Sequence, residues 1–354
     1  MTLSSKARDA IAGYIFILPN MIGFFLFLAF PVVASLFISA SEWNLITDPT
    51  FVGINNFLEL FNDSYFWQCL GNTAYFSLFS VLLGVAISLF LATLLNNPNI
   101  RLAGFLKSTI FLPVIFSTVS VALIWQWILD AHTGLLNHIL GFVGIGNIPW
   151  LMDPAWSMPS VIMVAVWRQI GYNMVIFLAA LQGVPQDLYE AADIDGAKPL
   201  HKFWNVTWPM ISPSTFFVIV TSIINSFQVF DITTVLTNGG PANSTNTIIM
   251  MVYQYGFQNF KMGYASAAAY VLFAIVLIIT AFQNIAAHLL QEDVQIECDV
   301  LVAGNKKAAR ERVVELITEA GMRGWHAGPI ENSAAAEALT SILIQINRSG
   351  IVSH

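Results

Sequence analysis

The chain has 354 residues, of which 56% are hydrophobic and 10% are charged. Soluble domains carry about 25% charged residues, so this composition excludes an ordinary water-soluble globular protein. A net charge of -7 without a basic cluster also argues against nucleic acid as a partner. The 27 Phe and 10 Trp residues fit a protein in contact with membrane lipid, where aromatic side chains anchor at the interfaces.

Six segments are long and apolar enough to cross a bilayer, which takes about 20 residues each. The predicted spans are residues 12–40, 69–95, 105–129, 158–182, 211–236 and 264–288. This pattern predicts an all-α membrane protein with six transmembrane helices.

The first predicted span is the longest, and it contains Pro19 and Pro31. A kink would explain its length, because proline removes a helix hydrogen bond. Lys6 and Arg8 ahead of an apolar run also fit a cleaved signal peptide. We favour a retained span, since the apolar region of a signal peptide is only about 7–15 residues long.

Positive charges alternate between the predicted loops. The N-terminus and the loops near 96–107 and 183–210 carry them, as Lys6, Arg8, Arg101, Lys107, Lys198 and Lys202. The loops near 41–68 and 130–157 have no Lys or Arg, and the loop near 237–263 has only Lys261. By the positive-inside rule, both chain termini are expected in the cytoplasm, in a multi-pass protein of the plasma (inner) membrane.

The sequence offers no catalytic, nucleotide-binding or metal-binding pattern. It lacks both G-x-x-x-x-G-K-[ST] and G-x-G-x-x-G, and its six histidines have no metal-ligand spacing. Cys69 and Cys298 fall on opposite sides of the predicted membrane, so no disulfide is expected. The chain is therefore predicted to hold no cofactor or metal and to have no catalytic residues.

The cytoplasmic loop near 183–210 contains the charged stretch EAADIDGAKPLHKFWNVTWP. PQDLYEAAD at 185–193, which overlaps the start of this stretch, predicts a short helix. Asp187 and Glu190 fall near its N-terminus, where the helix dipole favours acidic residues. Gly196 is expected to end this helix, and Pro199 to begin the next one. An amphipathic loop lying on the lipid is the alternative, although a lipid-binding face would be richer in Lys and Arg.

The order of residues in this loop resembles the EAA loop of permease subunits of ATP-binding-cassette importers. The matching residues are Glu190, Ala191, Ala192, Asp195, Gly196, Ala197 and Pro209, together with Phe203 and Val206. Trp208 stands where that family often has leucine. The resemblance implies the type I importer permease fold, and a loop that docks into a groove on a separate ATPase.

Further stretches resemble the same family. They are 51–76, 236–257 and 263–273, and the last two are typical of one half of a heterodimeric sugar or glycerol-phosphate permease. The resemblance covers roughly residues 10–283 and implies three partners: a second permease subunit, an ATPase dimer that hydrolyses ATP, and an extracytoplasmic solute-binding protein.

Polar residues inside the predicted spans are candidates for the substrate pathway, because polar groups in lipid are costly. The candidates are Asn225, Ser226, Gln228 and Asp231 in the fifth span, and Arg168 and Asn173 in the fourth. Asn225 and Gln228 are three residues apart and are expected on one helix face. Two alternatives stay open: an ion pair between Arg168 and Asp231, and hydrogen bonds between helices.

The composition changes near residue 283. CDVLVAG at 298–304 predicts a strand, and residues 306–321 predict a helix ended by Gly321, as in a small α/β domain. Residues 284–354 resemble the C-terminal part of NADPH-dependent deazaflavin (F420) reductases, without their nucleotide-binding part. We expect a non-catalytic fragment after a permease domain at 1–283, with a core at 69–283.

Two other functions are consistent with parts of the sequence. A reductase role would depend on the tail alone. An ion-coupled transporter would suit six spans and an intramembrane Arg168, but it would not need the EAA-like loop.

Overall fold

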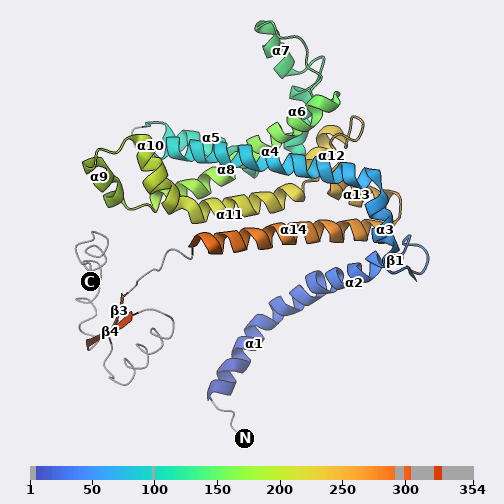
Figure 1. Cartoon of the computed structure of the whole chain (residues 1–354). Coiled ribbons are helices and arrows are strands. Elements are labelled where there is room, and N and C mark those ends of the chain that lie inside the picture. The colour runs from blue at the N-terminus through green and yellow to red at the C-terminus, as the bar shows by residue number, and fades with distance from the viewer. Residues whose placement is uncertain (1–4, 98–99, 292–298, 304–322, 329–354) are drawn as a thin grey trace. The chain divides into compact units, whose positions relative to one another are not determined.

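The computed structural model describes residues 5–97, 100–291, 299–303 and 323–328. The chain divides into two compact units, Met1–Asn284 and Ile285–His354. The described residues of the first unit are mainly helical, with one small hairpin of β1 (Ser41–Glu42) and β2 (Thr50–Phe51). Figure 1 shows the long helices of this unit.

Among the described residues, five helices are long and apolar enough to span a membrane. They are Gly13–Ser39, Ser64–Leu95 (α4), Pro154–Gln182 (α8), Pro199–Phe227 and Met262–Gln283. The first combines most of α1 (Ser5–Phe24), η1 (Phe25–Ala29) and α2 (Phe30–Ser39), and the last lies in α14 (Met262–Gln291). The predicted first, second, fourth and sixth spans are thus confirmed as helices.

The first span stays helical through both prolines. A π-helical turn, η1, directly precedes α2 and Pro31, and local π adjustments of this kind let a membrane helix tolerate proline. The side chains from Gly13 onward are largely exposed, which suits a helix surrounded by lipid.

The third predicted span, 105–129, is not one straight helix. It divides into α5 (Ala103–Ile115) and α6 (Thr118–Ile128), which are bent by 102°. Between them, Phe116 has extended backbone and Ser117 is non-helical, with φ −57° and ψ 134°. Pro113 weakens the last turn of α5 by removing a hydrogen-bond donor, and Ser117 is a residue type favoured just before a helix. With this bent pair as one span, the count reaches six.

The fifth predicted span, 211–236, is wrong at its end. The helix α11 (Trp208–Phe227) stops at Phe227, and α12 (Asp231–Thr237) begins after a break. Asn225 and Ser226 are weak helix formers, and Asp231 suits the first turn of a new helix. At its other end, α11 is continuous with η2 (Phe203–Thr207) and α10 (Pro199–Lys202).

The remaining described helices are short. They are α3 (Asn55–Asn62), α7 (Leu135–Phe142), α9 (Gln186–Ile194), α13 (Ile248–Tyr253) and the π-helical η3 (Gln254–Gln258).

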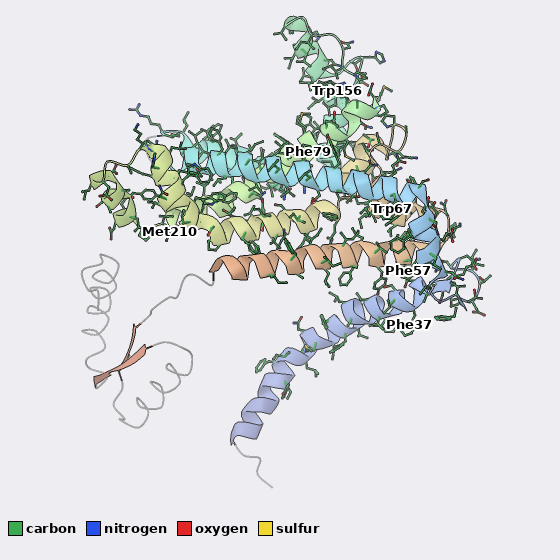
Figure 2. The ribbon with its side chains drawn as sticks, in the orientation of Figure 1. Phe37, Phe57, Trp67, Phe79, Trp156 and Met210 are labelled. Carbon is green, nitrogen blue, oxygen red and sulfur yellow. The ribbon has the colours of Figure 1, made fainter. Side chains whose placement is uncertain are left out.

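The centre of the first unit is formed by α4, α8 and α11, which pack against one another. Small residues of α4 lie at these contacts: Ser88 Oγ donates to the Ile170 carbonyl of α8, and Ser77 Oγ lies 2.6 Å from Ser226 Oγ of α11. The helix α5 packs closely on α8 as well, since a Cβ atom on Gly171 of α8 would come within 2.5 Å of the Ile110 carbonyl oxygen on α5. Large apolar side chains such as Trp67, Phe79 and Met210 stay exposed on the outside, as expected against lipid (Figure 2).

The second unit contains two described strands, β3 (Asp299–Ala303) and β4 (Arg323–Gly328), which pair in parallel. The strand predicted at 298–304 is therefore present. The helix predicted at 306–321 lies outside the described residues.

Candidate functional site: a polar cavity and an exposed helix

A cavity of about 440 Å³ lies where the two broken helices come together. Val114 and Thr118 line it from either side of the α5–α6 break, and Gln228 to Asp231 line it from the α11–α12 break. The helices after the breaks, α6 and α12, pack on each other. Irregular backbone at membrane depth is tolerated where it lines a cavity, so both breaks have a structural reason.

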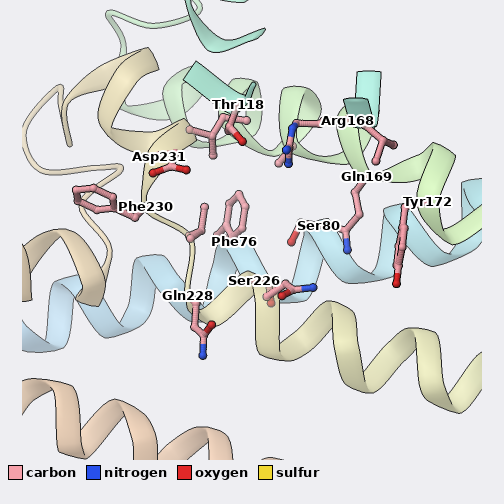
Figure 3. A pocket seen from close by; sticks show the side chains of 15 residues that line it. Phe76, Ser80, Thr118, Arg168, Gln169, Tyr172, Ser226, Gln228, Phe230 and Asp231 are labelled. Carbon is pink, nitrogen blue, oxygen red and sulfur yellow. The ribbon is translucent and has the colours of Figure 1, made fainter. Parts of the chain in front are cut away.

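Polar and aromatic side chains share the wall of this cavity (Figure 3). The polar ones are Ser80, Thr118, Arg168, Gln169, Tyr172, Asn225, Ser226, Gln228 and Asp231, and the aromatic ones include Phe76 and Phe230. Such a mixture offers hydrogen bonds and flat apolar faces to one ligand. A volume of this size falls within the roughly 300–1,000 Å³ of small-molecule sites.

Arg168 is the cationic group of the cavity wall. Its Nε atom is buried and has no hydrogen-bond partner in the described part of the chain. The proposed ion pair is absent: between described residues the structure has the pair Lys202–Asp193, and not one between Arg168 and Asp231. Both side chains therefore keep hydrogen-bonding capacity that they do not use on each other.

Five of the six sequence candidates line the cavity: Arg168, Asn225, Ser226, Gln228 and Asp231. The sixth, Asn173, is buried elsewhere, and its Nδ2 lies 3.4 Å from Ser222 Oγ on α11. That contact is the interhelical type of hydrogen bond that the sequence left open.

Asn225 and Gln228 both line the cavity, although Gln228 is the residue that caps the end of α11. Both reach the cavity since the chain turns away there, and both are exposed on its open side. The Ser226 hydroxyl already forms a hydrogen bond inside the protein, with its Oγ 2.6 Å from Ser77 Oγ of α4.

Sequence reasoning missed several residues of the wall. Ser80 and Gln169 are polar groups within spans, so the criterion that found Arg168 could have found them too. Phe76, Tyr172 and Phe230 could not be distinguished from the many other aromatic residues before the breaks were known.

The second candidate region is α9, which contains Glu190, Ala191 and Ala192. None of its residues is buried. Asp187, Glu190, Ala191 and Ile194 form an exposed face, and Ile194 is 87% exposed.

The end of α9 explains the residues that follow it. Asp195 is the C-cap, and Gly196 has φ +71°, which glycine adopts without strain. The Gly196 N–H donates to the Asp193 carbonyl at 3.0 Å, and the Ala197 N–H to the Ala192 carbonyl at 2.9 Å. This pair of bonds is the Schellman motif, and it confirms Gly196 as the end of the helix.

Pro199 begins α10 as expected. Pro209 directly follows the π-helical turn η2, the kind of local adjustment that lets a membrane helix tolerate proline. The loop from α9 to α11 is thus two helices joined by a tight turn, and its second helix runs without a gap into a membrane-length helix. Figure 1 shows α9 beside α10 at one end of the bundle.

Comparisons with known proteins match this architecture. Residues 84–291 match the family described as binding-protein-dependent transport system inner membrane component. The lactose transport system permease protein LacF of Rhizobium radiobacter is 35% identical over 80% of this chain and 97% of its own length. The sn-glycerol-3-phosphate transport system permease protein UgpA of Pectobacterium atrosepticum is 34% identical over 78% of this chain and 94% of its own length.

A solved structure agrees with the fold. A chain of a bacterial alginate ABC transporter, crystallised with an alginate pentasaccharide-bound periplasmic protein, superposes with a TM-score of 0.74. It is 25% identical and covers 82% of this chain and 98% of its own. The matched family region ends at residue 291, so the reductase resemblance of the later residues stays a prediction.

Proposed function

This chain belongs to the family of inner membrane components of binding-protein-dependent transport systems, and on that premise we propose that it forms one half of the membrane pathway of an ATP-driven importer for a carbohydrate or a related polyol phosphate. The substrate class is suggested by relatives that are named for lactose and for glycerol phosphate. An ion-coupled mechanism is not needed for a protein of this family.

The observation that carries the ATPase part of this proposal is the exposed face of α9. Its free side chains, Glu190, Ala191 and Ile194, combine a charge, a small residue and an apolar residue. A groove on a separate cytoplasmic ATPase would bury Ile194 and approach the backbone closely at Ala191. Glu190, Ala191, Ala192, Asp195, Gly196, Ala197 and Pro209 form this loop, with Gly196 and Pro209 shaping it rather than touching the partner.

The cavity supports the transport part. Asn225, Gln228 and Asp231 are exposed on its open side, while Ser80 and Phe76 form its buried wall. We assign the open side to the second permease subunit, which would complete the pathway. The substrate would be delivered from the opposite end by a solute-binding protein, as the periplasmic protein in the alginate transporter structure suggests.

Transport would follow from a shift between two packed arrangements of the helices. ATP binding closes the ATPase dimer, the dimer moves α9, and α9 moves the helix continuous with α10. This chain would supply no nucleotide site and no catalytic group to that cycle. The tail after residue 284 would supply none either.

Reconstitution tests the proposal. The full chain is co-expressed with a candidate ATPase, second permease and solute-binding protein from the same source, purified, and placed in liposomes. We expect ATP-dependent uptake of the ligand that the solute-binding protein binds. Uptake that proceeds without ATP, driven by a proton or sodium gradient, would refute an ATP-driven importer.

A further inference from the structure

One face of α9 is attached to the helix that follows it. Tyr189 and Asp193 are four residues apart and so lie on the same side of α9. The Tyr189 hydroxyl is 2.9 Å from Thr207 Oγ1, and the Asp193 carboxylate accepts a bond from Lys202 Nζ. Lys202 and Thr207 are five residues apart across η2, which is the spacing that a π-helical turn brings onto one face.

Tyr189 provides the stronger of the two attachments. It is the side chain of α9 that packs against the buried cluster containing Leu95, Leu181 and Ile211. Asp193, by contrast, is 64% exposed, and its pair with Lys202 is open to water. Surface ion pairs contribute little to stability, so α9 is held mainly by the ring and hydroxyl of Tyr189.

Thr207 forms the inner end of this bond. It is buried at 5% exposure, and its other hydroxyl contact, to the Lys202 carbonyl oxygen at 3.4 Å, is longer than a normal O–H···O bond. The 2.9 Å contact with the Tyr189 hydroxyl, in which either oxygen can be the donor, is the closer of the two. Removing the Tyr189 hydroxyl leaves the buried Thr207 hydroxyl with the long contact, which raises the cost of breaking the bond.

The surroundings of this bond leave room for movement. A cavity of about 300 Å³ adjoins it, lined by Tyr189, Thr207, Phe203 and residues from the ends of α4 and α8. The Tyr189 ring therefore has open space beside its contact with the buried cluster. The hydroxyl bond adds to that one-sided contact, so its loss should loosen α9.

We infer that Tyr189 and Thr207 are positioning residues that fix α9 to the helix leading to the cavity, so that a displacement of α9 is transmitted to the substrate pathway. The inference rests on the proposed function. From Pro199 to Phe227 the helix has 29 residues, or about 43 Å at 1.5 Å per residue, and its far end carries Asn225. A loose α9 would let the ATPase move without moving this helix.

Spin labels test the attachment itself in the full-length chain in lipid nanodiscs. Cys69 and Cys298 are replaced, and labels are placed at Asp187→Cys on α9 and Ser212→Cys on α11, both exposed positions. We expect Tyr189→Phe and Thr207→Val to lose the narrow distance distribution of the parent. The double variant should be no broader than either single one, because all three remove the same bond.

Thr221→Val is the matched control, because the Thr221 hydroxyl bonds only carbonyls of its own helix turn, Phe217 and Val218. Its distribution should stay narrow. Unchanged distributions in both Tyr189→Phe and Thr207→Val would overturn the inference, as would broadening that simply adds in the double variant.

The transmission is tested in the reconstituted importer. Tyr189→Phe should lower substrate transported per ATP hydrolysed by roughly two- to tenfold, the factor that one intramolecular hydrogen bond corresponds to. The ATPase should still co-purify at the yield of the parent. An unchanged ratio of transport to hydrolysis would contradict the inference. If the parent chain binds no ATPase, the proposed function fails instead, and the spin-label result still decides the attachment.

Discussion

Arg168 and Asp231, both within the described part of the chain, line one cavity without forming an ion pair. Arg168 lies on α8, and Asp231 lies at the start of α12, which begins after the break that follows Phe227. Under the proposed function, the Arg168 guanidinium, whose buried Nε has no partner among the described residues, and the Asp231 carboxylate bind hydroxyl groups of the substrate.

The first prediction concerns that guanidinium. Arg168→Met keeps the length of the side chain and removes its donors, so uptake by the reconstituted importer should fall by about tenfold or more, as for hydrogen bonds involving a charged group. Arg101→Met is the control, since Arg101 is exposed in a loop away from the cavity. Uptake by Arg168→Met equal to that of the control would show that Arg168 has no part in transport.

The second prediction concerns the amides on the open side of the cavity. Asn225→Ala and Gln228→Ala should each weaken substrate transport, because each removes hydrogen bonds that the proposal gives to the substrate. Asn62→Ala is the comparison, because Asn62 bonds only its own helix at Leu58. If both cavity variants show the affinity and rate of the parent, the two amides do not face the pathway.

The third prediction concerns Gly196. Gly196→Ala forces φ +71° on a residue with a Cβ, which costs about 1 kcal/mol. Gly196→Pro cannot adopt that angle at all and also removes the N–H that bonds the Asp193 carbonyl. We expect ATPase co-purification to decrease in the order Gly196→Asn, Gly196→Ala, Gly196→Pro, because asparagine tolerates this conformation best. Equal yields in all three would mean that the turn does not shape the docking surface.

The fourth prediction concerns helix packing. Gly171→Ala places a methyl group against the Ile110 backbone, where no side chain can move aside, and overpacking of this kind costs about 1–3 kcal/mol. Gly84→Ala on α4 meets nothing within 4 Å and is the matched control. Thermal unfolding in detergent should show a lower Tm for Gly171→Ala and a Tm near that of the parent for Gly84→Ala. The reverse order would contradict the α5–α8 contact.

The sequence predicted much of this fold because membrane-length apolar segments are long and unambiguous. Span-like helices at Ser64–Leu95 and Pro154–Gln182 follow from composition alone, and so does the stop at Gly196, which has a local cause. The bends at Ser117 and Phe227 were not predicted, because the apolar pattern continues through both.

The residues of the candidate site were predicted in part, because a polar residue inside an apolar span can be recognised individually. Arg168 and Asp231 were found in this way. Their arrangement was not predictable, because it depends on where α11 ends and on how α6 and α12 pack. The pairing of Tyr189 with Thr207 was missed as well, since nothing in the sequence marks a π-helical turn at Phe203–Thr207.

The central claim is that the exposed face of α9 docks onto a separate ATPase, and Glu190→Lys tests it most directly. The variant reverses one charge in the middle of that face and leaves the helix and its Schellman turn intact. Glu59→Lys is the matched control, an exposed glutamate on α3 in a loop assigned to the opposite side of the membrane. Affinity purification of the tagged chain co-expressed with its ATPase should recover clearly less ATPase with Glu190→Lys and the full amount with Glu59→Lys. Recovery of ATPase with Glu190→Lys at the yield of the parent chain would contradict the account.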